Sequence, residues 1–157
     1  MTPVRGETMA AFQIVDLPFA MHTRETFESR LHEPAVNRVR HAKLMIETYD
    51  QGHPIRSYPY PVQAIGFGKD LTLIALGGEV VVDYVLRLKK EYGAKGLIVA
   101  GYSNDVMCYI PSARVLREGG YEAVDSMFYY AQSGPFAGDV EERVFAGVRQ
   151  VMKSVGR

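Results

Sequence analysis

Two tyrosines and one glutamate stand where their side chains could act together. Tyr109 precedes a Pro-Ser helix start, and Tyr121 follows a pair of glycines and precedes a glutamate. Glu79 comes directly after Gly77 and Gly78, at the end of an apolar run. A carboxylate and two phenols could bind a hard cation, or the phenols could donate hydrogen bonds to an oxyanion. The chain has ten tyrosines, so aromatic packing is an equally open explanation.

Glu79 also has a plainer interpretation. The helix macrodipole favours an acidic residue in the first turn of a helix, whatever its chemistry. The glycine pair before Glu79 is not a phosphate loop, because the chain contains neither G-x-G-x-x-G nor G-x-x-x-x-G-K. The sequence therefore gives no support for a nucleotide site.

The histidines and the single cysteine offer no catalytic site of their own. His22, His32, His41 and His53 show neither i, i+4 spacing nor an H-x-H pattern, so each is interpreted as a surface or connector residue. Cys108 has no histidine in a recognisable relation to it and is predicted to be a buried, unreactive thiol. A lone cysteine also excludes an intrachain disulfide and a cysteine-based zinc knuckle.

The elements that must position these residues follow an α/β pattern. We predict strands over 62–67, 71–76 and 96–101, with a helix over 80–92 between the last two. The strand, helix and strand from 71 onward make a right-handed βαβ unit. Ligands of open α/β sheets bind at the carboxyl ends of the strands, and Glu79 comes just past one such end.

The first part of the chain predicts a strand followed by helices. Residues 9–19 alternate well enough for one strand, with Phe12, Ile14 and Leu17 as buried positions. Two helices in series follow. The proline-rich stretch 50–61 is predicted to be an irregular connector.

The last part of the chain predicts helices around one further strand. Ser112 can cap a short helix that Gly119 and Gly120 end. Residues 126–131 are a strand candidate, and the tail has valines at helical spacing. The fold class is therefore α/β, a mixed sheet with a βαβ unit and flanking helices.

Composition and charge exclude several classes of function. The 157 residues fit one domain. With 18 basic and 18 acidic residues, the chain has no electrostatic footprint for nucleic acid or an anionic membrane. No apolar run reaches the roughly 18 to 20 residues of a transmembrane segment. Glu7 stands where a signal peptide is apolar, so we expect a cytoplasmic protein as the chain is written.

Four motifs follow one another from Tyr58 to Glu122: Y-P-Y-P-V-Q-A, L-T-L-I-A-L-G-G-E-V-V-V-D-Y, A-G-Y-S-N-D-V-M-C-Y-I-P-S and E-G-G-Y-E. In type and order they resemble the neutral/alkaline, non-lysosomal ceramidases, and more closely bacterial members of that family. The resemblance implies a ceramidase-like α/β portion over 58–157. Residues 1–57 would then be an N-terminal strand and helical segment with a connector, within one structural domain.

The resemblance also implies roles for four residues. The family's enzymes look like zinc amidases that cut an N-acyl linkage, with the metal held by two histidines, a glutamate and a tyrosine. Glu79 and Tyr109 match the last two of these ligands. Tyr121 matches the tyrosine that binds the carbonyl or the oxyanion, and Asn104 would steady the loop around the metal. Zinc with an open position polarises a carbonyl and lowers the pKa of bound water to about 7.

The chain departs from the family pattern in its metal ligands. The two zinc-binding histidines of the family lie in earlier His-x-His-rich and Gly-rich motifs, and nothing like them is present. A serine-containing segment implicated in substrate contact is also missing. The chain therefore resembles an incomplete part of a larger catalytic domain, and we expect it to be inactive alone. The implied partners are a lipid amide substrate and a partner chain, or a second copy through self-association at an exposed seam.

Other interpretations remain open. The chain could be a non-catalytic remnant or an interaction domain that associates with a partner chain, which predicts a broad exposed apolar patch. It could also be a small-ligand binding domain that uses the strand-end cleft. The amidase hypothesis instead predicts that Glu79, Tyr109 and Tyr121 converge in the fold.

Overall fold

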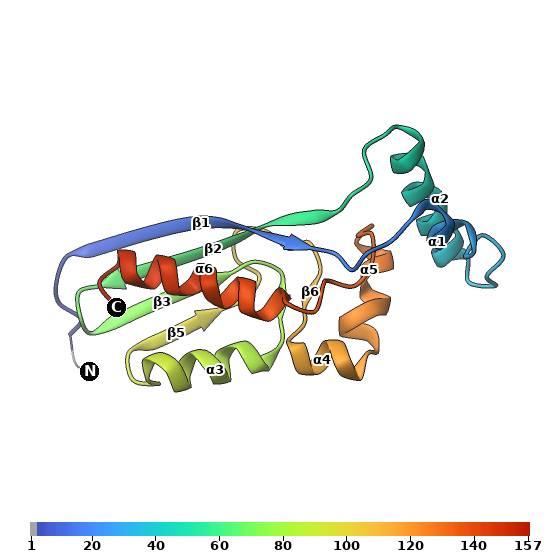
Figure 1. Ribbon diagram of the computed structural model, residues 1–157. Helices are drawn as coiled ribbons and strands as arrows, with labels where there is room; N and C mark the ends of the chain where they lie inside the picture. Colours follow the sequence, from blue (N-terminus) through green and yellow to red (C-terminus); the bar gives the residue numbers. More distant parts are fainter. Residues whose placement is uncertain (1–2) are drawn as a thin grey trace.

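A four-stranded mixed sheet forms the centre of the computed structural model, which describes residues 3–157 (Figure 1). The strand order is β1-β2-β3-β5. The first two pairs are antiparallel, and β3 and β5 are parallel. The strands are β1 (Thr8–Pro18), β2 (Ser57–Phe67), β3 (Leu71–Leu76) and β5 (Leu97–Ala100). The predicted α/β class with a mixed sheet is confirmed.

The connection from β3 to β5 passes through β4 (Glu79–Val80) and α3 (Val82–Tyr92). The predicted βαβ unit is therefore confirmed, although its helix begins at Val82. Glu79 lies in a strand and not in a first helical turn, so the helix-macrodipole explanation of this residue does not apply.

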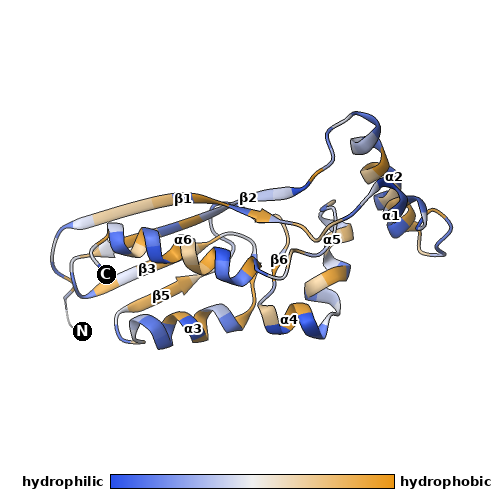
Figure 2. Cartoon of the chain, in the orientation of Figure 1, coloured by the Kyte–Doolittle hydropathy of each residue, from blue (hydrophilic) through white to orange (hydrophobic). Residues whose placement is uncertain are grey.

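One face of the sheet is covered by α3 and by α6 (Val140–Ser154), and Figure 1 shows α6 lying along the strands. A Cβ added to Gly147 of α6 would lie 2.4 Å from the Cγ2 atom of Val15, so this helix approaches β1 closely. The rings of Tyr84 on α3 and Phe145 on α6 stack with centroids 5.6 Å apart. Figure 2 shows β1 and β5 as largely apolar, and both helices as apolar on one side only. The valine spacing of the tail predicted α6 correctly.

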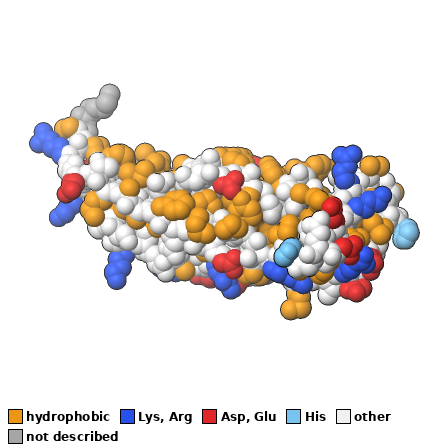
Figure 3. All heavy atoms as spheres, turned by 90° about the horizontal axis from the view of Figure 1, so that it is seen from above, with side chains coloured by type: hydrophobic (Ala, Val, Ile, Leu, Met, Phe, Trp, Pro, Cys, Tyr) orange, Lys and Arg blue, Asp and Glu red, His pale blue; other side chains and the backbone are white. Residues whose placement is uncertain are grey.

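The opposite face of the sheet is apolar and open. Phe12 is 55% exposed and Ile14 is 50% exposed, whereas Leu17 is fully buried. The prediction that all three are buried is wrong for the first two, because side chains alternate along a strand and even-numbered positions face away from α6. Ile98 of β5 lies on the same open face, in register with Leu73. Figure 3, a view onto the β1 edge, shows hydrophobic side chains along much of the molecule.

The N-terminal arm, residues 20–56, extends beyond the end of the sheet (Figure 1). It holds α1 (Arg24–Glu28) and α2 (Val36–Asp50) and has a small core of its own, made by Phe27, Ala42 and Met45. The predicted connector 50–61 is too long, because β2 already begins at Ser57. Pro59 and Pro61 fit in β2 because β3 pairs with β2 only from Val62 onward. Residues 57–61 therefore have no strand beside them on that edge.

The chain after β5 carries short elements that extend the fold beyond the sheet. β6 (Tyr109–Ile110) pairs with β4 in a second, two-stranded sheet. The helices that follow are α4 (Ala113–Glu118), the π-helical turn η1 (Tyr121–Asp125) and α5 (Ser126–Tyr129). The Ser112 hydroxyl accepts the Val115 amide at 3.2 Å, as expected for an N-cap. The strand predicted over 126–131 is wrong, because aromatic residues favour a strand only where a neighbouring strand is available.

No helix within residues 3–157 has the length and apolarity needed to cross a membrane.

Candidate functional site

Glu79 and Tyr109 are brought together by backbone pairing. They are register partners of the parallel strands β4 and β6. The Glu79 amide donates to the Cys108 carbonyl at 2.9 Å, and the Gly78 amide donates to the Asp105 carbonyl at 2.7 Å. Gly78 has a φ of 64°, and an added Cβ would lie 2.7 Å from the Cys108 carbonyl oxygen. Only glycine fits this turn without strain, so the turn fixes the position of Glu79.

The Glu79 carboxylate raises the pKa of two phenols. That of Tyr109 is raised to about 12, chiefly because the neighbouring carboxylate can accept the phenolic O–H, and further through burial and the negative charge. The same causes, in the same order, raise the pKa of Tyr102 to about 12. Both phenols are therefore protonated at neutral pH. Residues 102–109 follow the strand predicted over 96–101, at the end where ligands bind, but no motif assigned a role to Tyr102 itself.

Tyr121 lies against Tyr109. Their ring centroids are 5.7 Å apart and the rings meet edge to face at 74°. The ring of Tyr129 lies 6.4 Å from that of Tyr121. Tyr121 is 48% exposed, so its phenol can meet a ligand from solvent. The structure thus places Tyr109 opposite Glu79 and Tyr121 against Tyr109, so the three residues lie together, while their predicted roles stay predictions.

Asn104 contacts the sheet. Its amide donates to the Gln63 side-chain oxygen of β2 at 3.3 Å, and its backbone has a φ of 68°. The loop around it is held mainly by main-chain bonds, among them Ser103 to the Leu76 carbonyl at 3.0 Å. The role predicted for Asn104, steadying a loop around a metal, stays a prediction.

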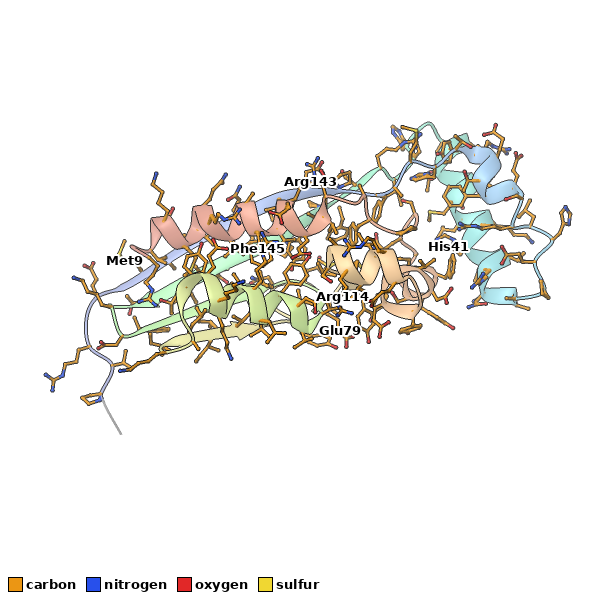
Figure 4. All side chains as sticks on the ribbon, turned by 60° about the horizontal axis from the view of Figure 1, so that its bottom comes forward. Met9, His41, Glu79, Arg114, Arg143 and Phe145 are labelled. Carbon is orange, nitrogen blue, oxygen red and sulfur yellow. The ribbon has the colours of Figure 1, made fainter. Side chains whose placement is uncertain are left out.

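A cleft of about 510 Å³ opens beside Glu79. It is lined by Tyr109 and by Arg114, Glu118 and Glu122, with valines of the β4–α3 connection forming its apolar wall. Figure 4 shows Glu79 and Arg114 near one another. The Arg114 guanidinium is bonded to Asp83 at 2.9 Å and to Glu118 at 2.7 Å. The Glu79 carboxylate makes no ion pair within residues 3–157, so phenols alone surround its charge.

Two histidines are buried in the arm, where they serve packing. The prediction that all four lie at the surface or in a connector is wrong for His22 and His41, which are 7% and 3% exposed. The Nε2 atom of His22 bonds to the Ile55 carbonyl at 3.0 Å, and that of His41 bonds to the Gln132 carbonyl at 2.5 Å. Burial lowers the pKa of both imidazoles, so they are neutral at pH 7.

The donor set does not make a zinc site by itself. Among the residues that the structure describes, no group of three or more His, Cys, Asp or Glu side chains could hold a metal ion. A catalytic zinc centre uses three protein ligands and an open position. Glu79 and Tyr109 supply one carboxylate and one phenol, and the phenol is protonated. Further ligands are needed before zinc fits here.

Cys108 takes no part in this chemistry. Its side chain is fully buried, and burial raises the pKa of the thiol to about 12. The prediction of a buried thiol is confirmed.

Comparison with known proteins gives one structural likeness. No protein-family model and no curated protein matches the chain. The crystal structure of neutral ceramidase from Pseudomonas aeruginosa is similar, with a TM-score of 0.50 and 15% sequence identity. The likeness covers 97% of this chain and 28% of that chain. Since the identity is so low, it shows the fold alone. The chain has the mixed α/β fold of one part of a neutral ceramidase.

Proposed function

We propose that the chain forms part of a zinc-dependent N-acyl amide hydrolase. Glu79 and Tyr109 contribute two metal ligands, and the remaining ligands come from outside residues 3–157. The arrangement of three residues carries the proposal. Glu79 and Tyr109 are register partners, and the centroid of the Tyr121 ring lies 5.7 Å from that of the Tyr109 ring. The likeness to part of a neutral ceramidase supports a hydrolase fold around them.

Tyr121 is the residue that binds the substrate carbonyl in this proposal. Negative charge develops on the carbonyl oxygen when an amide is attacked, and a preorganised O–H donor stabilises that charge. The half-exposed phenol of Tyr121 can reach such an oxygen from beside Tyr109. Zinc, when bound, would polarise the same carbonyl and lower the pKa of a bound water. The substrate class is an N-acyl amide, and a lipid amide is the expected member.

Metal binding at this site is coupled to proton release. Tyr109 keeps its proton beside Glu79, with a pKa of about 12, and a phenolate is the form that ligates a metal. Zinc, if bound, would therefore require release of this proton. The chain alone should bind zinc weakly and be inactive. The alternative of a non-catalytic remnant or interaction domain is not favoured, because it leaves the carboxylate and its two phenols without a role.

Calorimetric zinc titration of the purified chain tests this function, with free imidazole added to replace the missing ligands. We expect weak binding that imidazole strengthens and that Glu79→Gln and Tyr109→Phe each abolish. Glu118→Gln is the matched control, since it removes a carboxylate from the same cleft but not the one that meets the phenols. Zinc affinity that is the same in Glu79→Gln and in the unchanged chain would refute the proposal.

A further inference from the structure

The segment that carries Tyr121 is weakly anchored where it begins. It comprises residues 121–129, which form η1 and α5. Gly119 and Gly120 lead into it with φ angles of 73° and 89°. No atom lies within 4 Å of a Cβ added at either glycine, so no packing fixes this entry. The position of Tyr121 must be set by contacts further along the segment.

Arg38 of the arm contacts the segment at two points. Its guanidinium donates to the Asp125 carboxylate at 2.6 Å, at the last residue of η1. The same guanidinium lies over the Phe128 ring of α5, 4.9 Å from the ring centroid. The Glu33 carboxylate lies 3.5 Å from it on the other side and helps to orient it. A planar guanidinium can make both contacts at once, whereas a lysine ammonium cannot reproduce them.

His41 reinforces these contacts from the same face of α2. Its ring meets Phe128 edge to face at 5.0 Å, and its Nε2–H group donates to the Gln132 carbonyl just beyond the segment. The Gln132 side-chain amide donates in turn to the Met107 carbonyl at 3.2 Å, two residues before Tyr109. Figure 4 shows His41 on the arm, well away from Glu79. The arm therefore contacts the segment that carries Tyr121 directly, and it is linked to the residues before Tyr109 through Gln132.

We propose that Arg38 is a positioning residue that keeps Tyr121 against Tyr109. It fixes Asp125 and Phe128, and these hold the π-helical turn in which Tyr121 is the first residue. The arm has its own small core, so it does not need this ion pair to fold. The inference rests on the proposed function, because it concerns the same Tyr121. Its physical content, the geometry of the two rings, is independent of zinc and of activity.

Nuclear Overhauser effects between the ring protons of Tyr109 and Tyr121 test this role in the metal-free chain. We expect Arg38→Gln and Asp125→Asn each to weaken this signal at least several-fold, with little change in the melting temperature, because a half-exposed ion pair adds little to overall stability. Arg143→Gln is the control. It breaks a similarly exposed ion pair, between Arg143 of α6 and the N-cap residue Asp139, at 2.7 Å.

A charge exchange separates positioning from general loss of structure. Arg38→Asp alone should lose the ring contact, and Arg38→Asp combined with Asp125→Arg should recover part of it, because the exchanged pair restores the attraction but not the contact with Phe128. An unchanged signal in Arg38→Gln and Asp125→Asn, or an equal loss in Arg143→Gln, would overturn the proposal. Zinc titration reports separately on the function: if Glu79→Gln leaves zinc affinity unchanged while the Arg38 variants lose the ring contact, the positioning role stands and the proposed function fails.

Discussion

Glu79 and Tyr109 face each other across two strands of two residues each, and the carboxylate raises the pKa of the phenol to about 12. Strands this short form few hydrogen bonds with each other, and those bonds add little stability. Their pairing persists because the Gly78 turn is bonded to the loop that leads into Tyr109. Local backbone hydrogen bonds therefore set the distance between these two side chains.

Glu79→Gln should lower the pKa of both Tyr102 and Tyr109 from about 12 towards the ordinary phenol value of about 10. The amide removes the negative charge that opposes phenolate formation and weakens the hydrogen bonds that hold the protons. Ultraviolet titration of tyrosine ionisation measures the change. Glu118→Gln, in the same cleft, should leave the titration curve as it is. If the curves for Glu79→Gln and the unchanged chain coincide, the Glu79 carboxylate does not raise the pKa of Tyr102 and Tyr109.

Gly78→Ala should destabilise the fold by roughly 3 kcal/mol, because it adds a clash to backbone strain. The new Cβ would lie 2.7 Å from the Cys108 carbonyl oxygen. Gly52→Ala is the matched control, with a φ of 75° and open space around the position, and should cost only about 1 kcal/mol. Urea unfolding measures both. Equal costs for the two variants would mean that the turn adjusts without disturbing Glu79.

Acidification should destabilise the chain through its buried histidines. Burial lowers the folded-state pKa of His22 and His41 below the unfolded value of 6.5. The unfolded chain therefore takes up protons first. The stability contribution is present above pH 6.5 and is lost as the pH falls below it.

The variant His41→Gln isolates one of these groups. Its free energy of unfolding should fall less than that of the unchanged chain between about pH 7 and about pH 5. Urea unfolding at several pH values gives the slope, and His32→Gln is the control because that residue is not buried. A slope unchanged in His41→Gln would rule out His41 as a source of acid sensitivity.

The sequence correctly predicted the elements whose apolar residues recur with a clear period or whose order along the chain allows few arrangements. The valines of the tail recur at helical spacing, and Val144, Val148 and Val151 are buried as expected. Strand, helix and strand in series favour a parallel pair, and β3 and β5 are parallel. These elements depend on local pattern and chirality, which a single chain displays.

The rest depended on neighbours that a sequence does not display. The covered side of β1 depends on where α6, at the end of the chain, packs. The sequence does not show this, so the prediction that Phe12 is buried was wrong. Residues 126–129 form a helix because the segment packs on the arm. His41 can be buried because its ring N–H donates a hydrogen bond to a backbone carbonyl more than ninety residues away. For the site, motif order brought out Tyr109 and Tyr121, but the effect of Glu79 on the pKa of Tyr102 depends on how the loop folds.

The small core of the arm has a consequence for motion. Local opening costs less free energy where fewer apolar side chains are buried, and Phe27, Ala42 and Met45 are few beside the main core. Amide hydrogens of α2 should therefore exchange with solvent sooner than those of α6. Each opening of the arm would remove the contacts of Arg38 with Asp125 and Phe128 while the sheet stays folded, so the support that Tyr121 receives from the arm would be lost and regained at the rate at which the arm unfolds and refolds.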